Sequence, residues 1–154
     1  MKKLTLLAII AIPCLLSYAS FADAHTANTV DFLNSRPVSA KLPFSEIVRV
    51  ENTLYLSGQI GINPATKKLA EGGFTAEAEQ TLTNIKQTLK RHGYAMNQVV
   101  KCTVMLTDIT DFKAFNEIYT SYFSPPYPAR SAFAVNGLAL NSKVEVECIA
   151  TTAK

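Results

Sequence analysis

Histidine and paired cysteine motifs are scarce in this sequence, and their scarcity limits the metal chemistry open to it. The 154 residues include two histidines, His25 and His92, and three cysteines, none of them in a Cys-x-x-Cys motif. A structural zinc site needs about four Cys or His ligands at short, regular spacings. We therefore expect no structural zinc and no metal-ligating residues.

Clustered positive charge is also missing. The formal net charge is +3 at pH 7, and the lysines are scattered along the chain. Proteins that bind nucleic acid gather Lys and Arg into a patch or stripe that contacts the phosphates. The composition therefore argues against a nucleic-acid partner.

Only one long apolar run is present, and it lies at the N-terminus. Residues 1–3 are basic at two positions, residues 4–16 are almost wholly apolar, and Ala-Asp-Ala at 22–24 fits a signal peptidase site. The run is shorter than the roughly 20 residues of a membrane-spanning helix. We predict a signal peptide over residues 1–24, cleaved after Ala24, no membrane anchor, and a periplasmic or secreted protein.

The cysteines raise two separate questions. Cys14 could mark a lipoprotein, but Pro13 precedes it where a small residue is expected, so lipidation is the less favoured interpretation. Cys102 and Cys148 remain after cleavage, each in a segment that is typical of a strand. In an oxidising compartment they could form a disulfide, or they could pack as two buried free thiols. The sequence leaves both open.

The chain that remains after cleavage has the size of one ordinary domain. Residues 25–42 show no periodicity, and we expect them to form a flexible lead-in. Residues 43–154 are expected to form the single domain.

Hydrophobic periodicity predicts the elements of this domain. Helices are expected over 74–89, where apolar residues recur every three or four positions, and from 108 or 110 to 123. Strands are expected over 47–50, 54–60, 99–106, 130–135 and 144–151. The order ββαβαββ, with hairpins at both ends, indicates an α+β fold with a mixed sheet and both helices on one face. The uncovered face favours an oligomer.

Arg130 is the first candidate for a binding residue. It follows Pro128-Ala129 at the start of a strand, so its guanidinium extends from a rigid element and suits bidentate carboxylate binding. The alternative is an ordinary surface arginine that pairs with Glu145 or Glu147, and residue type alone favours that alternative.

The final predicted strand carries two acids on one face. Glu145 and Glu147 share that face, because strand side chains alternate, while Val144, Val146 and Cys148 point the other way. A carboxylate in mid-strand is costly unless it is exposed or paired. Either the face is solvated, or it lines a cleft in which a carboxylate could orient water.

Two weaker signals complete the candidates. Ser57-Gly58-Gln59 interrupts a strand with glycine, which often marks close approach of a ligand or another backbone, although a bulge without function would look the same. Asn116 is polar between Phe115 and Tyr119 on the second helix, where such residues usually bond to backbone. The aromatic stripe of that helix is interpreted as core.

The chain from about Pro43 to Ala150 resembles the reactive intermediate deaminase family, RidA or YjgF-like. The resemblance is carried by the order and spacing of short stretches: 56–60 (LSGQI), 63–64 (NP), 81–86 (TLTNIK), 100–104 (VKCTV), 107–108 (TD), 111–112 (DF), 115–119 (FNEIY), 127–131 (YPARS), 144–147 (VEVE) and 149–150 (IA). It implies a chorismate-mutase-like fold in a homotrimer, with three pockets between subunits.

Members of this family hydrolyse enamines and imines such as 2-aminoacrylate to a 2-oxo acid and ammonia, without a metal or an organic cofactor. Matched by position, Arg130 is the carboxylate-binding arginine and Glu145 the acid that positions water. Ser57, Gly58 and Asn116 match further pocket positions. The resemblance thus implies a cofactor-free hydrolase similar to 2-iminobutanoate/2-iminopropanoate deaminases, acting on a small imine or enamine with a carboxylate.

Two positions depart from the family pattern and qualify this expectation. Phe44 stands where many members have a pocket tyrosine, so the substrate-binding ring can pack but cannot donate a hydrogen bond. Ala132 replaces a pocket thiol that is common in the family, and Glu147 is interpreted as structural. A member of the same fold that binds small carboxylates without catalysis is the main alternative, and endoribonuclease activity fits the weak charge less well.

Overall fold

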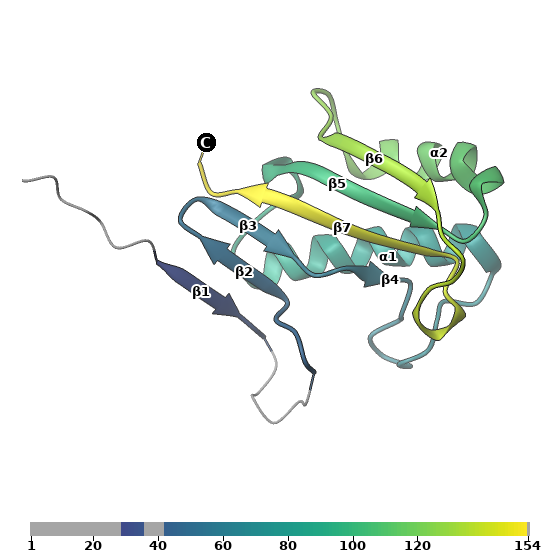
Figure 1. Ribbon diagram of the computed structural model, residues 1–154, viewed down its shortest axis with the longest axis horizontal. Helices are drawn as coiled ribbons and strands as arrows, with labels where there is room; N and C mark the ends of the chain where they lie inside the picture. The colour runs from purple at the N-terminus through teal and green to yellow at the C-terminus, as the bar shows by residue number, and fades with distance from the viewer. Residues whose placement is uncertain (1–28, 36–41, 154) are drawn as a thin grey trace, which may run out of the picture.

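The structure is a computed structural model, and it describes residues 29–35 and 42–153. The expected signal peptide and its cleavage site therefore lie outside the described residues. The described chain forms a single sheet with two α-helices packed on one face (Figure 1). The strands are β1 Val30–Leu33, β2 Ile47–Val50, β3 Thr53–Leu56, β4 Gln59–Ile60, β5 Val99–Leu106, β6 Ala129–Ala134 and β7 Val144–Thr151; the helices are α1 Gly73–Arg91 and α2 Phe112–Tyr122. Short 3-10 turns cover Met96–Gln98, Ile109–Asp111 and Ala139–Asn141.

The sheet is mixed, as the sequence predicted. Its strand order is β1-β2-β3-β7-β5-β6, and β4 also pairs with β7. Only β5 and β6 are parallel to each other, whereas the other pairs are antiparallel. The predicted order ββαβαββ is recovered, with β1 added at the start and the second strand divided into β3 and β4 at Ser57-Gly58.

The core lies between the helices and one face of the sheet. On β7 the buried side chains alternate with more exposed ones, as the sequence pattern predicted. Helix α1 buries the predicted stripe of Ala78, Leu82, Ile85 and Leu89. Burying one side chain of this size contributes roughly 1.5–3 kcal/mol, so this stripe holds α1 on the sheet.

The opposite face of the sheet has no covering layer in the described chain. Phe32, Tyr55 and Phe133 lie on it, and they are 68%, 48% and 46% exposed. Strand register places Phe32 and Tyr55 in one row, because both pair with Val48. The sheet therefore presents aromatic side chains to its surroundings, as expected of a surface that meets other chains.

The prediction that residues 25–42 form a flexible lead-in is wrong at Val30–Leu33, which form β1. This strand pairs with β2 in full register, and the Arg49 Nε atom donates to Asp31 Oδ2 at 2.9 Å. Without β1, β2 would be the edge of the sheet and would expose unpaired N–H and C=O groups. Pairing with β1 satisfies these groups. A strand of four residues is too short for hydrophobic periodicity to reveal it.

The hairpin predicted around Glu51-Asn52 is confirmed, with Val50 paired to Thr53. The turn chemistry differs, because Glu51 and not Asn52 has the positive φ, at 52°. The expected C-terminal hairpin is wrong, since β5 lies between β6 and β7. Turn-forming residues indicate that the chain bends after β6. They do not indicate which strands become neighbours, because strand pairing depends on how side chains of distant segments pack together.

The question left open about the cysteines is decided by the pairing of β5 with β7. Cys102 and Cys148 are directly opposite in the register and form a disulfide, and both are buried. The bond joins two neighbouring interior strands of the sheet. Within residues 29–35 and 42–153, no helix has the length and apolar character needed to cross a membrane.

Candidate active site

Arg130 begins β6, and helix α2 surrounds its side chain. Its guanidinium carbon lies 4.7 Å from the ring centroid of Tyr119, and the rings of Phe112 and Phe115 are within 6 Å. Its Nη2 atom donates to Asn116 Oδ1 at 2.5 Å. Aromatic faces attract a cation, so these contacts hold the guanidinium in one place while leaving its charge unneutralised.

The surface ion pair considered for Arg130 is not formed. Among the described residues Arg130 makes no salt bridge to a carboxylate. The guanidinium instead borders a pocket whose lining residues are Asn116, Tyr119, Thr120, Tyr127, Pro128 and Arg130. Arg130 is the only charged residue of that lining, so the pocket suits a ligand with one negative group.

Glu145 and Gly58 lie against each other, from β7 and from the turn between β3 and β4. A Cβ atom at Gly58 would overlap the Glu145 carboxylate, so glycine is required for this close approach. The sequence left open whether Gly58 marks the close approach of a ligand or backbone or only a bulge, and the group that approaches is the side chain of Glu145. Burial, and then the charge of Glu147, raise the pKa of Glu145 above its ordinary value. A raised pKa makes the carboxyl group a better proton acceptor than an ordinary glutamate.

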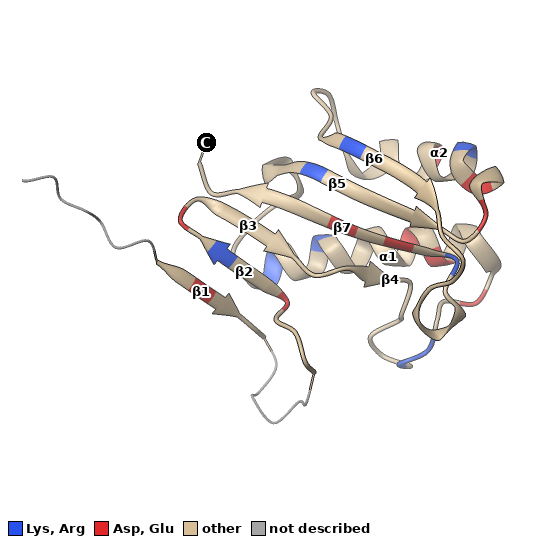
Figure 2. Ribbon diagram, viewed as in Figure 1, with Lys and Arg blue, Asp and Glu red and all other residues tan. Residues whose placement is uncertain are grey.

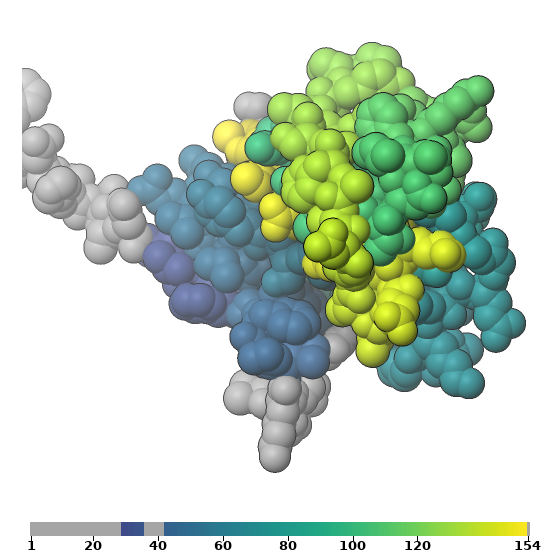
Figure 3. All heavy atoms as spheres, turned by 45° about the vertical axis from the view of Figure 1, so that its right-hand side comes forward, coloured from purple at the N-terminus to yellow at the C-terminus, as the bar shows by residue number. Residues whose placement is uncertain are grey.

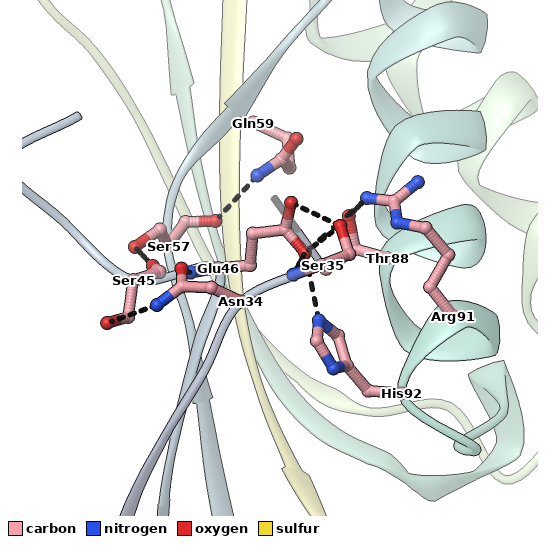
Figure 4. Close-up of polar contacts among 9 residues, drawn as sticks. All are labelled: Asn34, Ser35, Ser45, Glu46, Ser57, Gln59, Thr88, Arg91 and His92. Atoms are coloured by element: carbon pink, nitrogen blue, oxygen red, sulfur yellow. Dashed lines mark hydrogen bonds and ion pairs between the residues drawn. The ribbon is translucent and has the colours of Figure 1, made fainter. Parts of the chain in front are cut away.

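Ser57 precedes Gly58 and Phe44 precedes Ser45, which Ser57 contacts, but the two side chains differ in what they offer a ligand. The Ser57 hydroxyl donates to the carbonyl of Ser45 at 2.7 Å, so it anchors backbone (Figure 4). Phe44 is 53% exposed and has no polar atom on its ring. Ser57 therefore shapes the site through its backbone, and Phe44 is available for packing.

The predicted residues fall into two groups that one chain does not bring together. We call Asn116 and Arg130 the arginine half-site, and Phe44, Ser57, Gly58 and Glu145 the acid half-site. Arg130 pairs with Cys102, which faces the helices, whereas Glu145 pairs with Met105, which faces away from them. The two charged residues therefore lie on opposite faces of the sheet.

Acidic positions lie on β7 and basic positions on β5 and β6, which are neighbouring strands of the sheet (Figure 2). In the space-filling view α2 and β6, in green, form one side of the molecule, and β1, in purple, lies across from them (Figure 3). Within the described residues no group of three or more His, Cys, Asp or Glu is arranged to hold a metal ion.

Sequence reasoning missed two features of the site. The stripe of Phe112, Phe115 and Tyr119 was interpreted as core, and it is also the cage around Arg130. A buried cluster centred on Glu46 and His92 was not foreseen at all. The rarity of histidine was the only available signal, and nothing in the spacing of the two residues links them.

Together, a mixed sheet with helices on one face, an unpaired arginine and a partly buried acid define a small α+β enzyme with two separated half-sites. A family model described as Endoribonuclease L-PSP matches residues 34–152 of this chain. The chain belongs to this family, which includes the RidA and YjgF-like proteins, and it is a deaminase-like enzyme.

The relatives agree in sequence and in structure. The goat protein named 2-iminobutanoate/2-iminopropanoate deaminase is 47% identical over 70% of this chain and 79% of its own length. Reactive Intermediate Deaminase A of Arabidopsis thaliana is 39% identical over 87% of this chain and 72% of its own. The crystal structure of RidA from Psychrobacter has a TM-score of 0.69 at 41% identity, and covers 80% of this chain and 97% of that one.

Proposed function

We propose that the protein hydrolyses small imines and enamines that carry a carboxylate, of the 2-iminopropanoate type, to 2-oxo acids and ammonia. The observation that carries the proposal is the caged guanidinium of Arg130, which has no carboxylate partner among the described residues. Several relatives at about 45% identity are named for such imines. A bound carboxylate would supply the partner that Arg130 lacks.

The chemistry needs few groups, because an imine carbon is already electrophilic. Arg130 would bind the substrate carboxylate, and Glu145 would hold a water molecule and accept its proton as the oxygen adds to the imine carbon. Returning this proton to the nitrogen gives a carbinolamine. Transfer of the carbinolamine hydroxyl proton to its amino group then makes ammonia the leaving group, and the carbon–nitrogen bond breaks as the carbonyl of the 2-oxo acid forms. No step requires a metal or an organic cofactor.

We further propose that the working unit is a homotrimer with each pocket between two subunits. One chain places Arg130 and Glu145 on opposite faces of its sheet, so a pocket with both residues needs two chains. The uncovered sheet face with Phe32, Tyr55 and Phe133 offers the contact surface. Symmetric association would bury this face and complete three identical sites.

The test compares Arg130→Ala with the wild type, using the imine that an amino-acid oxidase generates in situ from alanine and larger amino acids. We expect the wild type to accelerate ammonia release beyond the spontaneous rate, and Arg130→Ala to lose the acceleration. Arg49→Ala is the matched control, because Arg49 is bound to Asp31 at the far edge of the sheet. An unchanged rate in Arg130→Ala contradicts the assignment.

The second candidate function is carboxylate binding without catalysis. It is favoured by Phe44, which cannot donate a hydrogen bond, and by the Ser57 hydroxyl, which is committed to Ser45. Tight binding of 2-oxo acids that is lost with Arg130→Ala, together with no acceleration of imine hydrolysis, would support it. Endoribonuclease activity, which the family description names, is checked by incubation of the purified protein with RNA.

Export is part of the proposal. It is supported by the apolar run at residues 4–16 with the Ala-Asp-Ala motif that follows, and by the Cys102–Cys148 disulfide, since disulfides persist in oxidising compartments. N-terminal sequencing of the protein from a cell fraction outside the cytoplasm should begin at His25. A chain that retains Met1 in the cytoplasm would contradict export.

A further inference from the structure

A buried carboxylate lies outside the two half-sites, at the start of β2. Glu46 is 9% exposed, and its Oε2 atom lies 2.8 Å from His92 Nε2 and 3.8 Å from Arg91 Nη2. The Ser35 hydroxyl lies 2.8 Å from each of its oxygens, and the Ser35 N–H donates to Oε2 (Figure 4). Ser35 follows β1 and His92 follows α1, so Glu46 joins three elements.

This cluster favours an ionised Glu46. Burial alone would raise its pKa, but hydrogen bonds from His92 and Ser35, with the charge of Arg91, outweigh burial and lower the pKa below its ordinary value. Arg91 is itself fixed, because its Nη2 atom donates to Thr88 Oγ1 at 2.9 Å. A buried charge with several partners resists displacement, because moving it breaks them together.

The backbone of the same residue is bonded to the acid half-site. The carbonyl of Glu46 accepts from the N–H of Ser57 at 3.2 Å, and the carbonyl of Ser45 accepts from the Ser57 hydroxyl at 2.7 Å. The Glu46 N–H in turn donates to Asn34 Oδ1 at 3.0 Å. Ser57 precedes Gly58, which lies directly against the Glu145 carboxylate. Ser57 and Gly58 thus connect the residue of the buried carboxylate, Glu46, with the acid that would place water.

We propose that Glu46, clamped by His92 and Ser35, is a positioning residue for Glu145. The clamp fixes the start of β2, the start of β2 fixes Ser57 and Gly58, and Gly58 sets where the Glu145 carboxylate lies. The inference rests on the proposed function and deepens it, because it assigns the cluster to placing water. Arg130 belongs to the other half-site, so substrate binding is independent of the clamp.

The kinetic test compares Glu46→Ala and Glu46→Gln with the wild type. A displaced carboxylate misplaces water, so we expect Glu46→Ala to lower kcat by roughly ten- to hundredfold while KM stays within about twofold. Glu46→Gln keeps a polar group for Ser35 and His92 and should recover most of the loss. A KM increase equal to the kcat loss, or an unchanged kcat, overturns the proposal.

The matched control is a core substitution at Ile85, which is fully buried on α1 and belongs to neither half-site. Ile85→Val or Ile85→Ala is chosen so that its fall in Tm equals that of Glu46→Ala. The control should keep the wild-type kcat. If it loses kcat to the same extent, Glu46 acts only through stability and the positioning role is wrong.

A second readout separates this inference from the proposed activity. NMR titration of ¹³C-labelled glutamate side chains reports the pKa of Glu145 whether or not the protein hydrolyses imines. In Glu46→Ala, Glu145 becomes more hydrated and its pKa should fall toward the ordinary value, whereas the Ile85 control keeps the wild-type pKa. An inactive wild type refutes the proposed function alone, and a Glu145 pKa that does not move in Glu46→Ala refutes the positioning role.

Discussion

At the scale of single residues, the two charged groups of the site depend on different neighbours. Arg130 is held by aromatic rings and one amide, which orient the guanidinium without pairing its charge. Glu145 is partly buried beside Gly58 and near Glu147, so its charged form is disfavoured. Both surroundings were only partly visible in the sequence: Gly58 signalled a close approach or a bulge, but the cage around Arg130 comes from a helix stripe that packing alone explains.

The raised pKa of Glu145 predicts how the rate depends on pH. If the ionised carboxylate accepts a proton from water, kcat falls as pH decreases through this pKa, and a raised pKa places the fall at a higher pH than for an ordinary glutamate. The measurement is the pH profile of kcat between pH 4 and 9, which spans the titration of a typical or raised carboxyl.

Glu147→Gln is the control for this profile. The charge of Glu147 contributes to the raised pKa of Glu145, so its removal should shift the fall in kcat toward lower pH while activity is retained. A profile that does not respond to Glu147→Gln would show that another group controls the rate.

At the scale of elements, the sequence predicted which segments are helices and strands better than which strands are neighbours. Alternation along β7 and the apolar stripe of α1 are local properties, so they could be read directly. The insertion of β5 between β6 and β7 depends on contacts between distant segments, and turn residues carry no information about it. For the same reason β1 was missed, because its pairing with β2 is visible only in space.

The disulfide between β5 and β7 gives a prediction at this scale. It closes a loop between residues 46 apart, and a cross-link of that length stabilises by about 2–4 kcal/mol, mainly by restricting the unfolded chain. Replacing Cys102 and Cys148 together with Ala should lower the free energy of unfolding by about this amount. Urea denaturation with and without reductant measures it.

The double replacement is its own control for reduction. Reductant should lower the stability of the wild type and leave the double variant unchanged. Equal stabilities of the oxidised wild type and the double variant would show that the bond does not constrain the unfolded chain.

At the scale of the whole molecule, one chain carries both groups of candidate residues but does not bring them together. The arginine half-site and the acid half-site lie on opposite faces of a single sheet. The fold could be predicted, because the order of the family motifs marks it, and the same resemblance implied pockets between subunits; the role of each candidate residue stays a prediction. The placement of Arg130 and Glu145 on opposite faces could not be predicted, because strand register and the face of each side chain appear only in the folded sheet.

Shared pockets predict complementation between inactive variants. Arg130→Ala keeps an intact acid half-site, and Glu145→Gln keeps an intact arginine half-site. If subunits exchange after mild denaturation and refolding, an equal mixture should regain about a quarter of the wild-type activity, because random assembly pairs two intact halves in that proportion. Ammonia release from the refolded mixture is the measurement.

Each variant refolded by itself is the control and should stay inactive. A mixture that remains inactive, although size measurements show that it has reassembled, would mean that each pocket is built within one chain.

The placement of Arg130 and Glu145 on opposite faces also bears on how damage spreads in a population of chains. In an assembly that divides its sites between neighbours, a chain with one defective half still lends its sound half to the next chain. A defect in Arg130 therefore silences the one pocket to which that arginine belongs and spares the others. Activity would then decline in proportion to the fraction of defective chains, without the dominant inhibition seen when one faulty subunit disables a whole oligomer.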